Sequence, residues 1–206
     1  MLGLSILEKD RQIVITGVDG AGRKTFASLY FPAKKLVEGQ FHISRRAKEI
    51  AVVVLLDSCH LQNQAEADVL ESVQKAVKRW KGRPLRLLLL LNKTDLVCSR
   101  RQNRDWVESV MCEYASCFKK VKANEKQIAA HSSLAVKRMR QMMEGEIDDD
   151  NVEDLGYLLL KSGHRMPKSV SPFNAKVYLA SHRKTFQMLT GERVVSEFLK
   201  NKKERK

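Results

Sequence analysis

A glycine-rich segment with two adjacent cations holds the residue types best suited to chemistry. Residues 17–25 read GVDGAGRKT; they follow a β-branched run at 12–16 and precede a helix expected over 23–30. Glycines allow backbone N–H groups to converge on an anion, and the first turn of a helix carries partial positive charge. The segment therefore predicts a phosphate-binding loop with these candidate nucleotide-binding residues: Gly17, Asp19, Gly20, Gly22, Arg23, Lys24 and Thr25.

The spacing of this loop differs from the usual pattern by one residue. That pattern is Gly, four residues, Gly, Lys and then Ser or Thr, whereas Arg23 here separates Gly22 from Lys24. In one register Arg23 takes the lysine position, and Lys24 takes the place of the hydroxyl that binds Mg²⁺. In the other register the loop bulges by one residue, and Lys24 and Thr25 act as usual. A plain strand-to-helix turn is the third interpretation.

A second motif, NKTD at 92–95, directly follows the apolar run 85–91. Asp95 could accept hydrogen bonds from N1–H and the 2-amino group of guanine, while Asn92 meets O6 and N7 and the stem of Lys93 covers the base. Open α/β sheets bind ligands at the carboxyl ends of their parallel strands. The motif therefore predicts a guanine site, and a helix N-cap made by Thr94 or Asp95 is the alternative.

Strands and helices alternate along much of the chain. The runs AVVVLL at 51–56 and LRLLLLL at 85–91 are typical of strands buried on both faces of a parallel sheet. The sequence predicts an α/β fold, in which a mostly parallel sheet carries helices on both faces. The expected helices span 23–30, 64–80, 104–118 and 185–200, and a last strand spans 176–180.

Residues 120–172 interrupt this alternation. They contain a basic helix candidate at 124–143, followed by an acidic run at 144–154. We expect a helical insertion here, within a single domain over 1–199. The tail 200–206, KNKKERK, is expected to be basic and disordered.

With both motifs in place, the chain resembles the Ras-like small GTPases. The resemblance covers 12–25, 51–118 and 176–200, and Asn92, Lys93 and Asp95 fall on the guanine-specificity motif of that family. Ser181 lies near the weaker motif behind the base, so the resemblance adds it to the guanine-binding residues. It implies a shortened P-loop GTPase-like fold with GTP or GDP as the ligand.

The parts that sense and cleave the terminal phosphate are missing. Only 25 residues lie between Thr25 and Ala51, too few for two switches, two strands and an Asp-x-x-Gly motif. The nearest candidate is DSCH at 57–60. Phosphoryl transfer depends on positioning and charge neutralisation, so we expect a pseudo-GTPase with no catalytic residues and no Mg²⁺. Shortened members of the family act as structural subunits, one of them in the kinetochore, which implies a scaffold that binds partner proteins in a multi-subunit complex.

The charge of the chain widens the range of partners. Lys and Arg number 38 against 24 Asp and Glu, a net charge of +14, which favours acidic partners. The basic C-terminal region could bind nucleic acid without sequence preference. No apolar run is long enough to cross a bilayer, so no transmembrane segment is expected.

Cysteine usage and the N-terminus bear on location. The four cysteines form no Cys-x-x-Cys pair, and no secretory signal is recognised, so we expect an intracellular protein. The basic C-terminal tail could serve as a nuclear-import patch, so we favour the nucleus over the cytoplasm. Two other functions stay open. One is an active GTP-binding protein with atypical switches, and the other is a P-loop nucleotide kinase, whose loop resembles DGAG at 19–22.

Overall fold

The computed structural model describes residues 2–8, 10–44, 46–80, 84–94, 108–116, 123–144 and 180–200. These residues fall into two compact units. The first, the sheet unit, comprises Met1–Asn92 and Glu108–Ala129, and the second, the helical unit, comprises Lys93–Val107 and Ala130–Lys206. The single domain and the disordered tail expected from the sequence stay predictions.

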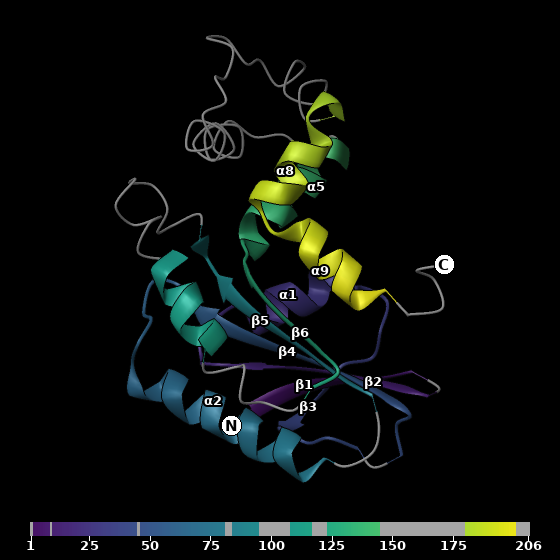
Figure 1. Ribbon diagram of the computed structural model, residues 1–206. Coiled ribbons are helices and arrows are strands. Elements are labelled where there is room, and N and C mark those ends of the chain that lie inside the picture. Colours follow the sequence, from purple (N-terminus) through teal and green to yellow (C-terminus); the bar gives the residue numbers. More distant parts are fainter. Residues whose placement is uncertain are drawn as a thin grey trace. The chain divides into compact units, whose positions relative to one another are not determined.

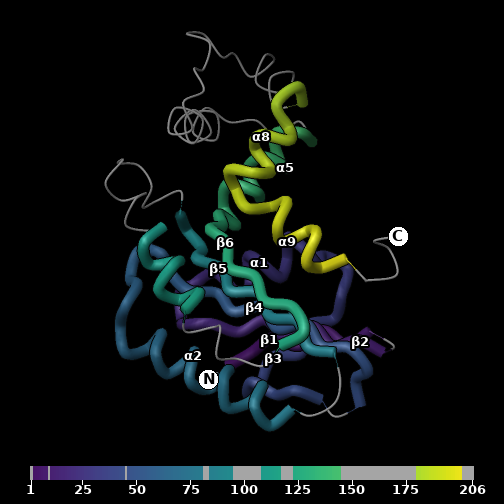
Figure 2. Tube along the Cα trace, in the orientation of Figure 1, coloured from purple at the N-terminus to yellow at the C-terminus, as the bar shows by residue number. Residues whose placement is uncertain are grey.

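A six-stranded sheet forms the core of the sheet unit (Figure 1, Figure 2). The strand order is β3-β1-β2-β4-β5-β6, with parallel pairing of β2 with β4 and of β4 with β5. Only β1 runs antiparallel to both of its neighbours. The predicted α/β class with a mostly parallel sheet is confirmed. The strands are β1 (Leu2–Glu8), β2 (Arg11–Gly17), β3 (Val37–Gln40), β4 (Glu49–Asp57), β5 (Leu85–Asn92) and β6 (Glu125–Ala130).

The two central strands, β4 and β5, are the most buried part of the sheet. Every residue of β5 is buried, and so is every residue of β4 except the half-buried Glu49. A strand covered on both faces needs apolar side chains at successive positions, which explains the runs at 51–56 and 85–91. Their pairing extends from Ile50 with Leu85 to Asp57 with Asn92.

Two strands beyond β2 were not predicted. β1 forms an antiparallel pair with β2, from Gly3 opposite Thr16 to Glu8 opposite Arg11, and β3 lies outside β1 at the edge. The short segment 26–50 thus supplies one strand and the N-terminus supplies the other. These two strands fill the sheet beyond the glycine-rich loop without an Asp-x-x-Gly motif.

The helices of the sheet unit lie on opposite faces of the sheet. α1 (Arg23–Tyr30) follows β2, and α2 (Gln64–Arg79) connects β4 to β5. The β2–α1–β3 and β4–α2–β5 connections run in opposite directions across the sheet, so right-handed crossovers place α1 and α2 on different faces (Figure 1). Residues 108–116 form a further helical segment, the described part of the helix expected at 104–118.

The helical unit contains α5 (Ser133–Glu144), α8 (Arg183–Leu189) and α9 (Glu192–Leu199). Two expectations were wrong here. The helix expected at 124–143 begins only at Ser133, because 125–130 form the strand β6, so the insertion is not purely helical. The helix expected at 185–200 is divided by Gly191, whose φ of 71° belongs to the left-handed region.

Some predicted elements lie outside the described residues: 145–172 of the insertion, 176–179 of the expected last strand and most of the basic tail. Among the described helices, none combines the length and apolar character needed to span a bilayer.

Candidate functional site

Close contacts with neighbouring strands explain two glycines of the predicted phosphate loop. Gly17 has a φ of +154°, and a Cβ there would lie 2.0 Å from the carbonyl oxygen of Leu55 on β4. Gly22 has a φ of +83°, and its Cβ would lie 2.8 Å from Nδ2 of Asn92. Gly22 also caps α1, where its left-handed conformation turns the chain into the helix. Contact with the backbone of β4 therefore requires glycine at position 17, and the left-handed conformation together with the contact to Asn92 favours glycine at position 22.

The backbone of the loop is partly used by the protein itself. The N–H of Val18 donates to Leu55 (3.3 Å), and the N–H of Ala21 donates to Val18 (3.3 Å). By contrast, the N–H groups of Arg23, Lys24 and Thr25 have no acceptor within the described residues. These three groups open α1, and the start of a helix is where an anion is best stabilised.

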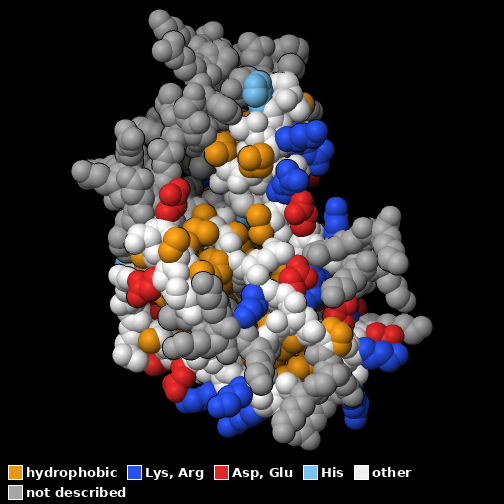
Figure 3. All heavy atoms as spheres, in the orientation of Figure 1, with side chains coloured by type: hydrophobic (Ala, Val, Ile, Leu, Met, Phe, Trp, Pro, Cys, Tyr) orange, Lys and Arg blue, Asp and Glu red, His pale blue; other side chains and the backbone are white. Residues whose placement is uncertain are grey.

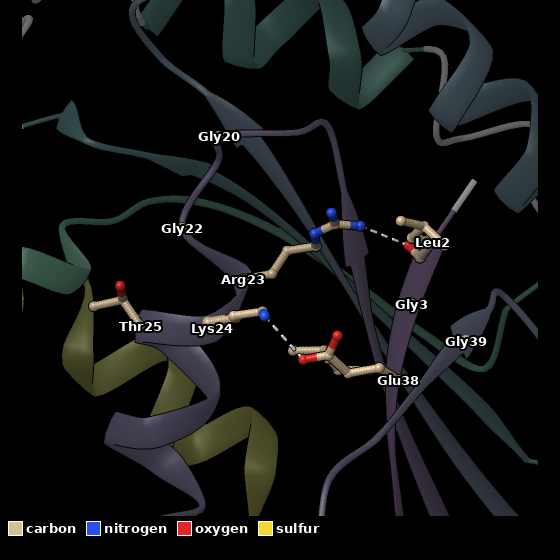
Figure 4. Close-up of a pocket in the computed structure, with 10 residues that line it drawn as sticks. Leu2, Gly3, Gly20, Gly22, Arg23, Lys24, Thr25, Glu38 and Gly39 are labelled. Carbon is tan, nitrogen blue, oxygen red and sulfur yellow. Dashed lines mark hydrogen bonds and ion pairs between the residues drawn. The ribbon is translucent and has the colours of Figure 1, made fainter.

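The two cations of the loop are held toward β1 and β3 (Figure 4). The guanidinium of Arg23 contacts Oδ1 of Asp19 at 2.6 Å and donates to the carbonyl oxygen of Leu2 at 2.8 Å. Nζ of Lys24 lies 3.1 Å from Oε1 of Glu38 on β3. The Thr25 side chain lies away from both cations. The protein thus supplies its own partners to the positive charges that would neutralise a phosphate.

A pocket of about 400 Å³ opens between this loop, the start of α1 and strands β1 and β3 (Figure 4). Its size falls in the range of small-molecule sites. None of its lining residues is aromatic, so the pocket offers no ring on which a base could stack. The lining residues are Leu2, Gly3, Leu4, Gly20, Gly22, Arg23, Lys24, Thr25, Glu38 and Gly39.

Asn92 is the one predicted guanine-binding residue that belongs to the sheet unit. It ends β5 with only 2 % of its surface exposed. Its Nδ2 donates to the carbonyl oxygen of Ala21 at 2.7 Å. The side-chain amide therefore ties the loop to the end of β5, and this contact brings Asn92, the first residue of NKTD, against the loop.

The remaining guanine-motif residues belong to the helical unit or lie outside the described residues. Lys93 has a φ of 65°, unusual for a residue with a side chain. The backbone and the hydroxyl of Thr94 both donate to the carbonyl oxygen of His131, at 3.2 and 2.9 Å. Ser181 is exposed, and its hydroxyl lies 3.0 Å from Nδ1 of His182. Asp95 lies outside the described residues.

Asp57, the nearest candidate for a switch aspartate, is used in its own turn. It is 4 % exposed at the end of β4, and its Oδ1 accepts a hydrogen bond from the N–H of Cys59 at 3.0 Å. The N–H of His60 donates to the Asp57 carbonyl oxygen at 2.9 Å. This is a local turn that aspartate commonly stabilises.

The structure adds a buried carboxylate, Glu66, with its hydrogen-bond donors, which the sequence did not predict. Oε2 of Glu66 accepts hydrogen bonds from the Tyr114 hydroxyl (2.6 Å) and from the N–H of Gln62 (2.7 Å). Burial raises the pKa of Glu66, and burial together with the bond to Glu66 raises the pKa of Tyr114. The spacing of Asn63 and Glu66 is the signal that could have revealed it, because Asn63 caps α2 and accepts from the N–H of Glu66.

No known protein family, curated protein or solved structure matches the chain. Within the described ranges, no group of three or more His, Cys, Asp or Glu side chains is placed to hold a metal ion.

Proposed function

We propose that this chain is a catalytically inactive, small-GTPase-like scaffold that binds partner proteins. One observation carries the proposal: the guanidinium of Arg23, whose side chain is only 17 % exposed, is held by the carbonyl oxygen of Leu2 and by Asp19 of the same chain. The pair of Lys24 with Glu38 is exposed on both sides and adds little. Phosphoryl transfer needs such cations free to neutralise the transferred group. A loop whose Arg23 already binds the backbone of β1 is better suited to hold strands together than to cleave a phosphate.

The burial of Asp57 supports the same proposal. An aspartate that positions a metal or water must present its oxygens to the ligand, whereas Oδ1 of Asp57 is bound within its own turn. The pocket beside the unpaired amides of α1 favours one refinement, in which GTP or GDP is retained as a static ligand without Mg²⁺.

The first test asks whether the loop holds or cleaves a nucleotide. Nucleotide is extracted from the purified chain and identified by chromatography, and GTP hydrolysis is then measured with and without Mg²⁺. The proposal expects hydrolysis equal to the buffer blank. Mg²⁺-dependent hydrolysis that disappears in Asp95→Ala would instead establish an active GTPase, and phosphate transfer from ATP to a nucleoside monophosphate would establish a kinase.

The partner side of the proposal is a multi-subunit protein complex in the nucleus. The net charge of +14 also allows nucleic acid as a partner. A binding titration with a random-sequence duplex at two salt concentrations separates these cases, because sequence-independent binding weakens steeply as salt rises.

A further inference from the structure

A second hollow of the sheet unit lies between α2 and the helical segment 108–116. It has a volume of about 460 Å³. Three carboxylates line it, those of Glu66, Glu71 and Glu113, and no Lys or Arg is among the residues that surround it. The full lining is Gln62, Asn63, Glu66, Ala67, Leu70, Glu71, Gln74, Glu113 and Tyr114, called here the α2 groove.

The charge of the α2 groove is opposite to that of the whole chain. The net charge is +14, yet the groove is lined by acidic groups, and Figure 3 shows both signs of charge on the face it displays. A cation at its edge is Lys75, whose Nζ lies 2.7 Å from Glu71 with both side chains 62 % exposed. Such an exposed pair is weak. The groove therefore repels nucleic acid and favours a basic group.

Glu66 gives the groove a buried acceptor. The residue is 1 % exposed, and its Oε1 has no hydrogen-bond partner among the described residues, although Oε2 has two. A buried polar atom without a partner costs free energy and is rare in folded proteins. The neighbouring Gln62 is held at a φ of +64°, and strained backbone of this kind concentrates at functional sites.

The floor and rim of the groove fit a long side chain that ends in charge. Leu70 and Tyr114 are mostly buried and provide apolar surface. At the rim, Nε2 of the exposed Gln62 donates to Oε2 of Glu113 at 2.8 Å. A guanidinium could replace this neutral amide donor while its aliphatic stem covers the apolar floor. Arginine suits such a site better than lysine, because its planar fork pairs with carboxylates and is less strongly hydrated.

We infer that the α2 groove binds an arginine side chain presented by a segment of a partner protein. The inference deepens the proposed scaffold function, since it names the chemistry by which one partner is recognised. It does not depend on whether the phosphate loop holds a nucleotide.

The test uses the full chain and a capped five-residue peptide with a central arginine between two leucines. An otherwise identical peptide carries citrulline, which has the same shape without the charge. Amide chemical shifts are followed by NMR during both titrations. The arginine peptide is expected to shift the amides of Gln62, Glu66 and Tyr114 saturably, with an affinity at least about tenfold above that of the citrulline peptide.

Substitutions of the exposed carboxylates at the rim test the inference and leave the buried Glu66 in place. The double variant Glu71→Gln, Glu113→Gln should weaken arginine-peptide binding by about fivefold or more. Asp68→Asn is the matched control, because Asp68 is an exposed carboxylate on α2 that bonds to Gln64 and does not line the groove. Equal binding of both peptides, shifts located elsewhere, no shifts at all, or an equal loss in Asp68→Asn would overturn the inference. None of these outcomes bears on the nucleotide assays.

Discussion

Single residues in the glycine-rich loop serve the packing of the sheet before they serve any ligand. Gly17 ends β2 so close to β4 that a side chain would collide with the Leu55 carbonyl, whereas a Cβ added at Gly20 would meet no described atom within 4 Å. Both have positive φ, at +154° and +82°. The same residue type is therefore required at one position by contact and at the other by conformation alone.

This difference predicts unequal costs for two alanine substitutions. Gly17→Ala should lower the free energy of unfolding by about 2–4 kcal/mol, since it adds a steric clash to backbone strain. Gly20→Ala should cost only about 1–2 kcal/mol, the penalty of a left-handed residue with a side chain. Urea denaturation of both variants measures the difference. Equal losses would show that contact with Leu55 does not constrain the loop.

The hydroxyl of Tyr114 is the second group whose removal has a defined cost. Tyr114→Phe deletes the 2.6 Å hydrogen bond to Glu66 and leaves that buried carboxylate with one donor fewer. The free energy of unfolding should fall by about 1–2 kcal/mol in urea denaturation. Ser116→Ala is the control, because Ser116 is an exposed hydroxyl on the same helical segment. A loss as large in the control would contradict the assigned role of the Tyr114–Glu66 bond.

At the scale of elements, the strands with continuous apolar runs and the amphipathic α2 could be predicted to within two residues. Burial on both faces or along one stripe leaves a periodic signal in the sequence. The glycine-rich loop and Asn92 were each expected directly after a strand, whereas the contact of Asn92 with Ala21 was not predicted.

β1 and β6 could not be predicted because their stability comes from distant partners. β1 contains Gly3 and the polar Ser5, and its strand conformation depends on pairing with β2 and β3. β6 begins with Glu125 and Lys126, residues that are common in helices, and it leads into α5. Its first residue is instead fixed by a carboxylate contact with Arg86 of β5. Likewise, no local pattern shows that Leu2 and Glu38 pair with the cations of the loop, whereas Asp19 lies only four residues before Arg23.

Arg86 on β5 forms ion pairs with carboxylates of both neighbouring strands, so its substitution tests how much these pairs stabilise the sheet. Its side chain is fully buried and lies 2.7 Å from Glu125 on β6 and 3.4 Å from Glu49 on β4. Arg86→Met leaves two mostly buried carboxylates without this cation, so unfolding free energy should fall by about 3–5 kcal/mol. Urea denaturation measures the loss.

Two further variants distinguish the cost of leaving buried carboxylates without a cation from the cost of losing any ion pair. Adding Glu49→Gln and Glu125→Gln to Arg86→Met should restore about half of the lost stability, because the repelling carboxylates are then neutral. Arg193→Met removes an exposed i,i+4 pair with Glu197 in the helical unit, and it should change stability by less than about 0.5 kcal/mol. A similar cost for Arg86→Met and Arg193→Met would show that the buried cluster does not join the strands.

At the scale of the whole molecule, the sheet unit and the helical unit contain buried titratable groups with opposite responses to acid. Burial raises the pKa of Glu66 in the sheet unit, so its contribution to stability is greatest at low pH and falls as pH rises above 4.5. Burial lowers the pKa of His131 in the helical unit to about 4; a backbone hydrogen bond with Thr190 opposes this shift, and the charge of Arg140 adds to it. The contributions of Glu66 and His131 to the free energy of unfolding therefore change in opposite directions with pH, and a measurement on the whole chain gives only their sum.

A variant of His131 isolates one of these terms. Because its folded pKa of about 4 lies below the ordinary value of 6.5, the unfolded chain takes up the proton first as pH falls. The His131 contribution should be constant above pH 6.5, decline by about 1.4 kcal/mol per pH unit below it, and level off near pH 4 after a total loss of about 3 kcal/mol. Urea denaturation of the protein and of His131→Leu from pH 4 to pH 7.5 gives this term as the difference between the two curves. Glu66 and the exposed carboxylates contribute equally to both curves, so their effects cancel in the difference. If the difference in unfolding free energy between the two proteins does not vary with pH, His131 does not stay neutral in the fold.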